Sequence, residues 1–199
     1  MFFRQPKATD VRAAAWATAV AKLGLVEVDD GHGLLDRLIG PDSDLLTAGV
    51  WCVAGDAPPE VYVFERRAGP TAQPVASCLL TVPGTLASVP LRVTRRLRAQ
   101  LATLQASATQ ASLVVTGDDA FDEAVTVVAR ESVRANGMLT PAVCMALGRL
   151  VQRGERAPVL VISESTLLAS TALEEPAGIE LLVTDVMGVY AALVASGSG

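Results

Sequence analysis

An arginine-rich segment carries the residue types in this sequence that are best suited to binding an anion. Guanidinium groups bind phosphate and carboxylate through paired hydrogen bonds. Because the chain is acidic overall, such a cluster is a candidate site for an anion or for an acidic protein surface. The alternative is a solvated face neutralised by the chain's own carboxylates. The candidate residues are Arg92, Arg95, Arg96 and Arg98, joined by Arg66 and Arg67.

A second group of residues could bind a metal ion or carry acid/base chemistry. Asp118, Asp119, Asp122 and Glu123 place four carboxylates within six residues. Hard cations prefer oxygen ligands, and paired carboxylates can exchange protons. The spacing differs from that of a helix-loop-helix calcium site. The simpler interpretation is a solvated turn between strands, and a metal site at Asp118, Asp119 and Asp122 is the alternative.

The chain contains one histidine, His32, between Gly31 and Gly33. Its surroundings predict a turn or a helix start. An enzyme would require His32 to meet Asp118 and Asp119 at a metal or a small substrate. The sequence has no nucleophile elbow, phosphate-binding loop or dinucleotide fingerprint. We therefore expect no cofactor, and the sequence favours a protein without catalytic activity.

Three widely spaced cysteines indicate neither a disulfide framework nor a zinc site. Cys52, Cys78 and Cys144 each lie in an apolar run. Free cysteines of this kind are usually small buried side chains. The pattern predicts a reducing compartment, and we expect the protein to be cytoplasmic.

Composition limits the partners that the protein could have. The 199 residues are 51% hydrophobic and carry a formal net charge of −5. An acidic surface repels nucleic acid and anionic membranes, so nucleic-acid binding is not expected. The apolar stretch 179–194 contains Glu180 and Asp185. It predicts a buried helix rather than a membrane span, and the N-terminus lacks the pattern of a signal peptide.

Hydrophobic periodicity and turn residues predict helices at both ends of an antiparallel sheet. The first forty residues are expected to be helical, with helices at 9–23 and 34–39. Strands at 48–54, 61–67 and 75–82 should form a meander. An extended piece at 89–93 should lead into a helix at 95–104. The remaining predictions are a strand at 112–116, a turn at 118–122, a strand at 124–129, a helical turn at 133–138, a helix from Thr140 to about Gly154, a hairpin of 158–163 with 166–170, and a helix from Ile179.

These elements predict an α+β fold with antiparallel strands, because the regular alternation of a parallel sheet is missing. Residues 1–196 are expected to form one domain, with two lobes meeting near 106–111 as the alternative. Residues 197–199 are expected to form a flexible tail.

The order of several apolar segments resembles that of a loose group of uncharacterised bacterial proteins. The segments are 50–53, 61–64, 121–127 and the Leu139-Thr140-Pro141 helix start, and the resemblance spans about 14–170. It implies a similar arrangement of strands and helices. Val125 stands where that group tends to have an aromatic residue. The matching residues are structural, so the resemblance implies no catalytic residue.

We therefore predict a non-enzymatic accessory or assembly protein that contacts another protein. Apolar excess beyond one core is often buried at such interfaces, so a homodimer is one form of this prediction. Candidate surfaces are the segment 92–98 and an exposed apolar helix face. The alternatives are a carboxylate-based metal enzyme and an anion sensor that uses the arginine cluster.

Overall fold

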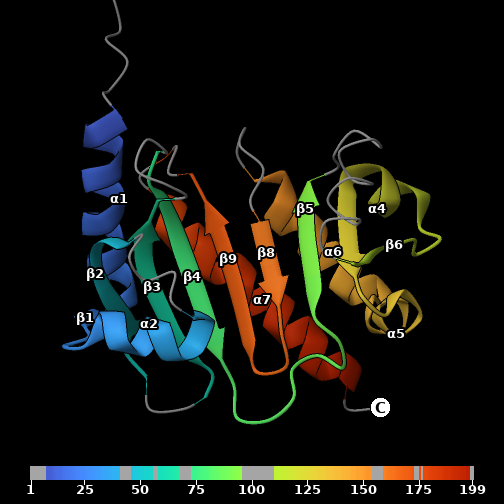
Figure 1. Cartoon of the computed structure of the whole chain (residues 1–199). Coiled ribbons are helices and arrows are strands. Elements are labelled where there is room, and N and C mark those ends of the chain that lie inside the picture. Colours follow the sequence, from blue (N-terminus) through green and yellow to red (C-terminus); the bar gives the residue numbers. More distant parts are fainter. Residues whose placement is uncertain are drawn as a thin grey trace, which may run out of the picture.

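The computed structural model describes residues 8–40, 46–55, 58–67, 73–95, 110–153, 159–172, 175 and 177–197. Within these residues, nine antiparallel strands form one sheet in the order β1-β2-β3-β4-β9-β8-β5-β7-β6 (Figure 1). The strands are β1 Leu25–Glu27, β2 Leu46–Val53, β3 Glu60–Arg66, β4 Val75–Thr81, β5 Leu91–Arg95, β6 Ser112–Val114, β7 Val125–Ala129, β8 Val159–Ile162 and β9 Thr166–Thr171.

Helices accompany the sheet at both ends of the chain, so the predicted α+β class is confirmed. The helices are α1 Ala8–Leu23, α2 Gly31–Ile39, α4 Asp119–Ala124, α5 Ser132–Met138, α6 Pro141–Gln152 and α7 Gly178–Gly197. The predicted meander is confirmed, because β3 pairs with both β2 and β4. The predicted hairpin of β8 with β9 is also confirmed.

Strand β5 joins the two groups of strands that the sequence suggested. It pairs with β7 on one side and with β8 on the other. β9 in turn pairs with β4, so strands from before and after residues 106–111 belong to one sheet. Most of that predicted lobe boundary lies outside the described residues.

The larger apolar core lies between one sheet face and helices α1, α6 and α7 (Figure 1). Alternate strand residues such as Val63, Leu80 and Val93 point into it and are fully buried. α6 begins as predicted, because the Thr140 hydroxyl accepts a hydrogen bond from the Val143 backbone N–H at 3.4 Å. Pro141 then occupies the first turn, where a missing N–H costs nothing.

Helix α7 contributes much of this core. Its stretch Gly178–Ser196 has a mean hydropathy of 1.7 and is, among the described helices, the one long and apolar enough to cross a membrane. The same stretch packs against α1, α6, β4 and β9. Its buried side chains are Ile179, Leu182, Val183, Val186, Val189 and Leu193.

A smaller core lies on the other sheet face, beneath α2. Leu35 of α2 is fully buried and packs over β2, β3, β4 and β9. Asp30 begins this helix by accepting a hydrogen bond from the Gly33 N–H at 3.1 Å. The strand residues in this core are Val50, Tyr62, Phe64, Leu79 and Leu168.

The contact of α2 with β2 requires a glycine at position 31. A Cβ atom there would lie 2.7 Å from Val50 Cβ, well inside van der Waals distance. We expect Gly31→Ala to lower the free energy of unfolding by about 1–3 kcal/mol through overpacking. The matched control is Gly148→Ala in α6, where a Cβ meets no atom within 4 Å. This control should raise stability by about 0.5–1 kcal/mol through helix propensity. Urea unfolding of both variants measures the difference, and equal stabilities would contradict the close contact.

Three local predictions were wrong. The first forty residues include β1, a strand too short to show a period, which forms by pairing with β2. Arg95 ends β5 instead of beginning a helix, and residues 96–104 lie outside the described part of the chain. The expected turn at 118–122 begins α4, because Asp118 accepts a hydrogen bond from the Phe121 N–H at 3.1 Å.

Candidate functional site

The sheet face that carries α2 is covered by this helix only over part of its width. One row of side chains crosses the uncovered part of that face. Leu168 of β9 is beneath α2, and the row continues across β8, β5, β7 and β6 through paired residues. We call these four residues the open row: Val161, Arg92, Val128 and Leu113. No described helix covers them (Figure 1). Val161 and Leu113 remain 37% and 42% exposed.

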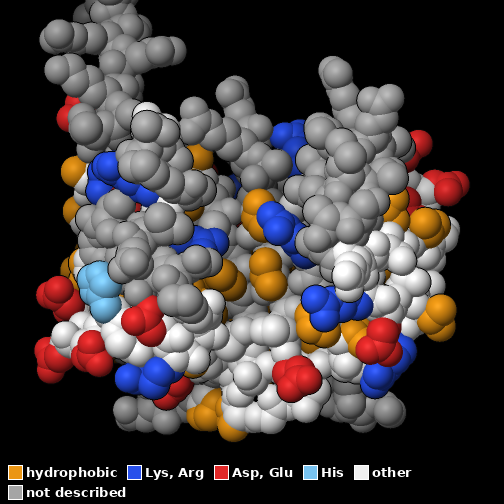
Figure 2. Space-filling view, viewed as in Figure 1, with side chains coloured by type: hydrophobic (Ala, Val, Ile, Leu, Met, Phe, Trp, Pro, Cys, Tyr) orange, Lys and Arg blue, Asp and Glu red, His pale blue; other side chains and the backbone are white. Residues whose placement is uncertain are grey.

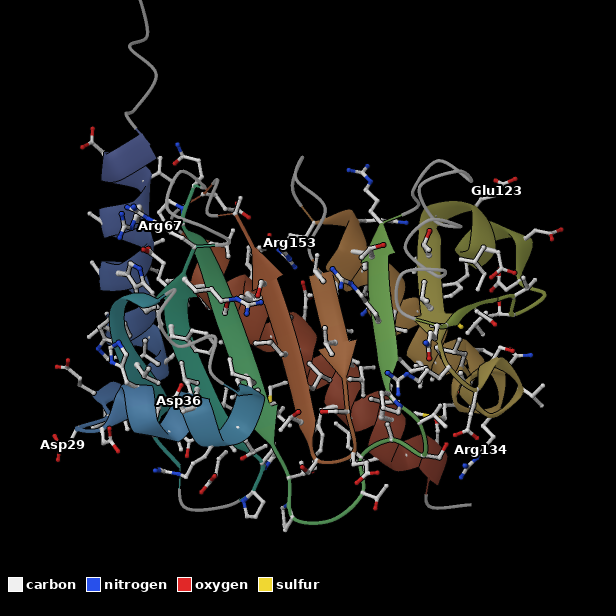
Figure 3. All side chains as sticks on the ribbon, in the orientation of Figure 1. Asp29, Asp36, Arg67, Glu123, Arg134 and Arg153 are labelled. Atoms are coloured by element: carbon white, nitrogen blue, oxygen red, sulfur yellow. The ribbon has the colours of Figure 1, made fainter. Side chains whose placement is uncertain are left out.

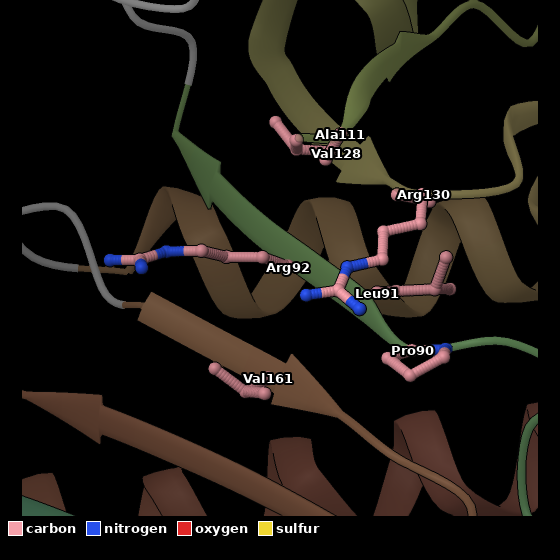
Figure 4. Close-up of a pocket in the computed structure, with 8 residues that line it drawn as sticks. Pro90, Leu91, Arg92, Ala111, Val128, Arg130 and Val161 are labelled. Atoms are coloured by element: carbon pink, nitrogen blue, oxygen red, sulfur yellow. The ribbon is translucent and has the colours of Figure 1, made fainter. Parts of the chain in front are cut away.

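A hollow of about 410 Å³ lies over the middle of the open row. Its floor is mainly apolar, whereas two arginines, Arg92 and Arg130, stand beside it. Figure 4 shows Arg130 reaching from the end of β7 back across β5, with Val161 on the opposite side of the hollow. The remaining lining residues are Pro90, Leu91, Ala111, Val128 and Ala129.

The two guanidinium groups come from neighbouring strands. Arg92 of β5 pairs with Val128 of β7, and Arg130 follows two residues later on the same face. Such diagonal neighbours lie about 7–8 Å apart at the backbone, within reach of long side chains. Both arginines are exposed, and within the described residues neither has an ion pair or a hydrogen bond. Figure 2 shows basic and apolar atoms side by side near the middle of this face.

A hydroxyl on the same face of β5 also has no hydrogen-bond partner in the described part of the chain. Thr94 is 6% exposed, and its Oγ1 makes no hydrogen bond with any described residue. Buried hydroxyl groups are normally hydrogen-bonded. Thr94 therefore adds an unused polar atom two residues along the strand from Arg92.

The other predicted arginines that the structure describes do not join this hollow. Arg95 pairs with Val125 and so faces the opposite side of β5 from Arg92. Arg66 donates to Ser170 Oγ at 3.1 Å. Strands β4, β9 and β8 separate Arg66 from Arg92, a distance of about 19 Å at 4.8 Å per strand. Arg67 lies on the α1 side (Figure 3), and Arg96 and Arg98 are outside the described residues.

The predicted carboxylate cluster supports local structure. Asp118 caps α4, and Asp122 accepts hydrogen bonds from the Thr116 and Gly117 N–H groups and from the Thr116 hydroxyl. Asp119 and Glu123 are exposed. Across the described part of the chain, no three His, Cys, Asp or Glu side chains are grouped so that they could hold a metal ion.

His32 does not meet this cluster. It lies in α2, which packs on β2, whereas α4 packs on α6 and β7. These helices are at opposite ends of the sheet, as the labelled Asp36 of α2 and Glu123 of α4 show (Figure 3). The arrangement required for the enzyme alternative, with His32, Asp118 and Asp119 around one substrate, is therefore not formed.

The cysteines have the properties of structural side chains. Burial raises the pKa of the Cys78 thiol to about 12. Burial, followed by the nearby charges of Asp118 and Asp122, raises that of Cys144 to about 11. Burial and the charge of Glu60 raise the pKa of Cys52 as well. Because the thiolate is the nucleophile, none of the three is activated at neutral pH.

Comparison with known proteins adds a fold neighbour. The sequence matches no family model, and no curated protein matches it. The crystal structure of the mycobacterial trehalose monomycolate transport factor A, TtfA, matches with a TM-score of 0.58. The two proteins share a fold. The match covers 96% of each chain at 10% sequence identity, so it carries the arrangement of elements and no residue-level role.

Proposed function

We propose that this protein is a non-catalytic accessory factor that contacts another protein through the open row. The observation that carries the proposal is that two exposed apolar side chains, Val161 and Leu113, share a row with Arg92 on the part of the sheet that no described helix covers. Arg92 makes no ion pair or hydrogen bond with any described residue. Exposed apolar patches with polar surroundings are typical of interaction sites. Arginine is among the residues enriched at such interfaces.

Two further observations support this proposal over an enzyme. The carboxylates of the predicted acidic cluster either cap local backbone or face solvent, and His32 is at the other end of the sheet. The fold neighbour TtfA is named as a transport factor. A factor that assists a transport process is an accessory protein, which is the class that we propose here.

Site-specific photo-crosslinking in the native host tests the protein contact. A photoreactive amino acid replaces Val161 in the open row or, as the matched control, Val133 on α5, which is 87% exposed. We expect one discrete adduct from position 161 and none of the same mass from position 133. Arg92→Glu should abolish the adduct by reversing the charge in the row.

The adduct mass separates two forms of the proposal. Twice the chain mass would identify a second copy of this protein, whereas another mass would identify a different partner protein. Equal, diffuse labelling from positions 161 and 133 would contradict a specific contact at the open row.

Anion binding is a second candidate function, and the hollow beside the open row favours it. Arg92 and Arg130 stand there with no described ion-pair partner. Paired guanidinium groups suit phosphate or carboxylate. This candidate anion site keeps Arg92 of the predicted cluster and adds Arg130, whereas Arg96 and Arg98 lie outside the described residues.

A further inference from the structure

We infer that the hollow between Arg92 and Arg130 binds the phosphate headgroup and the first part of the alkyl chain of a single-chain phosphomonoester lipid. This inference rests on the anion-binding candidate and names its ligand class. It does not require the protein contact proposed above. The juxtaposition that carries it is two guanidinium groups, without an ion-pair partner among the described residues, beside an apolar floor.

The charge of the arginine pair selects the headgroup. A phosphate monoester carries about −1.5 to −2 charges at neutral pH and offers three acceptor oxygens. Figure 4 shows the exposed Arg92 side chain extended away from Arg130. Two guanidinium groups can bind one phosphate from two sides once the Arg92 side chain turns toward Arg130, and the proposal includes this rotation. A carboxylate carries a single charge and has two oxygens, so it would leave one of these arginines less well satisfied.

The floor of the hollow selects an alkyl chain. Val161 and Val128 lie on either side of Arg92 along the open row, and Leu113 continues the row to the sheet edge. Pro90 and Ala111 add further apolar surface. Removing such surface from water stabilises a complex by roughly 25 cal/mol per Å². A free phosphate ion would gain nothing from this floor.

The size of the hollow favours a single chain. Small-molecule sites commonly measure about 300–1,000 Å³, and this hollow of about 410 Å³ is near the lower limit. The acidic chain as a whole repels extended anionic surfaces, with a net charge of −5. A single lipid molecule meets the local positive charge without bringing a membrane surface against the rest of the protein.

Calorimetric titration with dodecyl phosphate, kept below its micellar concentration, tests the inference. We expect dodecyl phosphate to bind at least about tenfold more tightly than either inorganic phosphate or dodecyl maltoside. Inorganic phosphate lacks the alkyl chain, and dodecyl maltoside lacks the phosphate group. Equal affinity for inorganic phosphate would mean a plain anion site. Equal affinity for dodecyl maltoside would mean non-selective apolar binding. Either result would overturn the inference.

Matched variants locate the binding. Arg92→Ala/Arg130→Ala should weaken dodecyl phosphate binding by about tenfold or more. The control Arg37→Ala/Arg134→Ala removes the same charge from two exposed arginines that pair with Asp30 and Glu131. This control should leave the affinity within about twofold. Equal weakening by both double variants would overturn the site.

A third pair of variants tests the floor. Val161→Asp places a carboxylate beside the expected phosphate, and it should weaken dodecyl phosphate binding about as strongly as loss of the arginines. Val115→Asp is the control, because Val115 is 69% exposed and does not line the hollow. Circular dichroism of each variant confirms folding. If position 161 forms a protein adduct but the protein does not bind dodecyl phosphate, the lipid inference is wrong and the proposed protein contact is still supported.

Discussion

Replacing Phe64 by alanine is expected to lower the free energy of unfolding by about 3–5 kcal/mol. Phe64 is fully buried in the core beneath α2, where its strand neighbours are Val50 of β2 and Ser77 of β4. Loss of the ring removes apolar contacts and leaves a cavity that the surrounding strands can fill only in part. Because α2 depends on this core, the helix should loosen as well. Urea unfolding followed by circular dichroism measures the change.

The control for Phe64 is the exposed Val133. Val133→Ala should change stability by no more than about 0.5 kcal/mol, as is usual for surface positions. Hydrogen exchange of the α2 amides provides a second measurement, since it reports local opening. A loss below about 1 kcal/mol in Phe64→Ala, with unchanged protection of α2, would mean that this core does not hold the helix.

Replacing Arg12 by alanine is expected to lower the free energy of unfolding by about 2–4 kcal/mol, because a buried carboxylate loses its arginine. Glu65 of β3 is 1% exposed and points toward α1. Arg12 binds it with Nε and Nη2, each at 2.5 Å from a carboxylate oxygen, and the Trp16 indole N–H donates at 3.4 Å. Arg12 is 37% exposed, so the expected cost lies below the upper range for fully buried pairs. Thermal and urea unfolding measure it.

A double variant separates the ion pair from general damage. Arg12→Ala/Glu65→Leu removes both charges and fills the buried position with an apolar side chain. It should recover stability to within about 1 kcal/mol of the parent, because buried ion pairs contribute little relative to apolar replacements. If the double variant is as unstable as Arg12→Ala, packing of the arginine chain rather than charge pairing is the source of the cost.

The sequence alone predicted those elements whose ends are marked by a strong local pattern of residues. Thr140 and Pro141 mark a helix start by capping and by a missing N–H, and α6 begins there. The meander follows from β-branched runs separated by short turns. The α+β class follows from the same runs, because they lack the regular strand–helix alternation of a parallel sheet. These features depend on residues that are close together in the sequence, so they can be predicted without knowing the tertiary structure.

The candidate hollow could not be predicted in full, because it depends on pairing between distant strands. Arg92 stood out within a basic cluster, but strand alternation sends Arg95 to the opposite face. Arg130 is isolated in the sequence and meets Arg92 only because β5 pairs with β7. Strand alternation places Arg130 on the same face as Val128. That Arg92 is its neighbour on this face follows only from the register between β5 and β7, which the sequence does not reveal. The carboxylates were conspicuous in sequence, and local caps account for Asp118 and Asp122.

The position of β9 has a consequence for how the chain is made. Ala76 of β4 pairs with Thr171 of β9, so this edge of the β2-β3-β4 meander stays unpaired until residues 166–171 have been synthesised. An unpaired strand edge can pair with another chain and so lead to aggregation. A ribosome-bound chain that ends before residue 166 therefore exposes that edge, and we expect the nascent protein to need shielding until β9 has emerged from the exit tunnel.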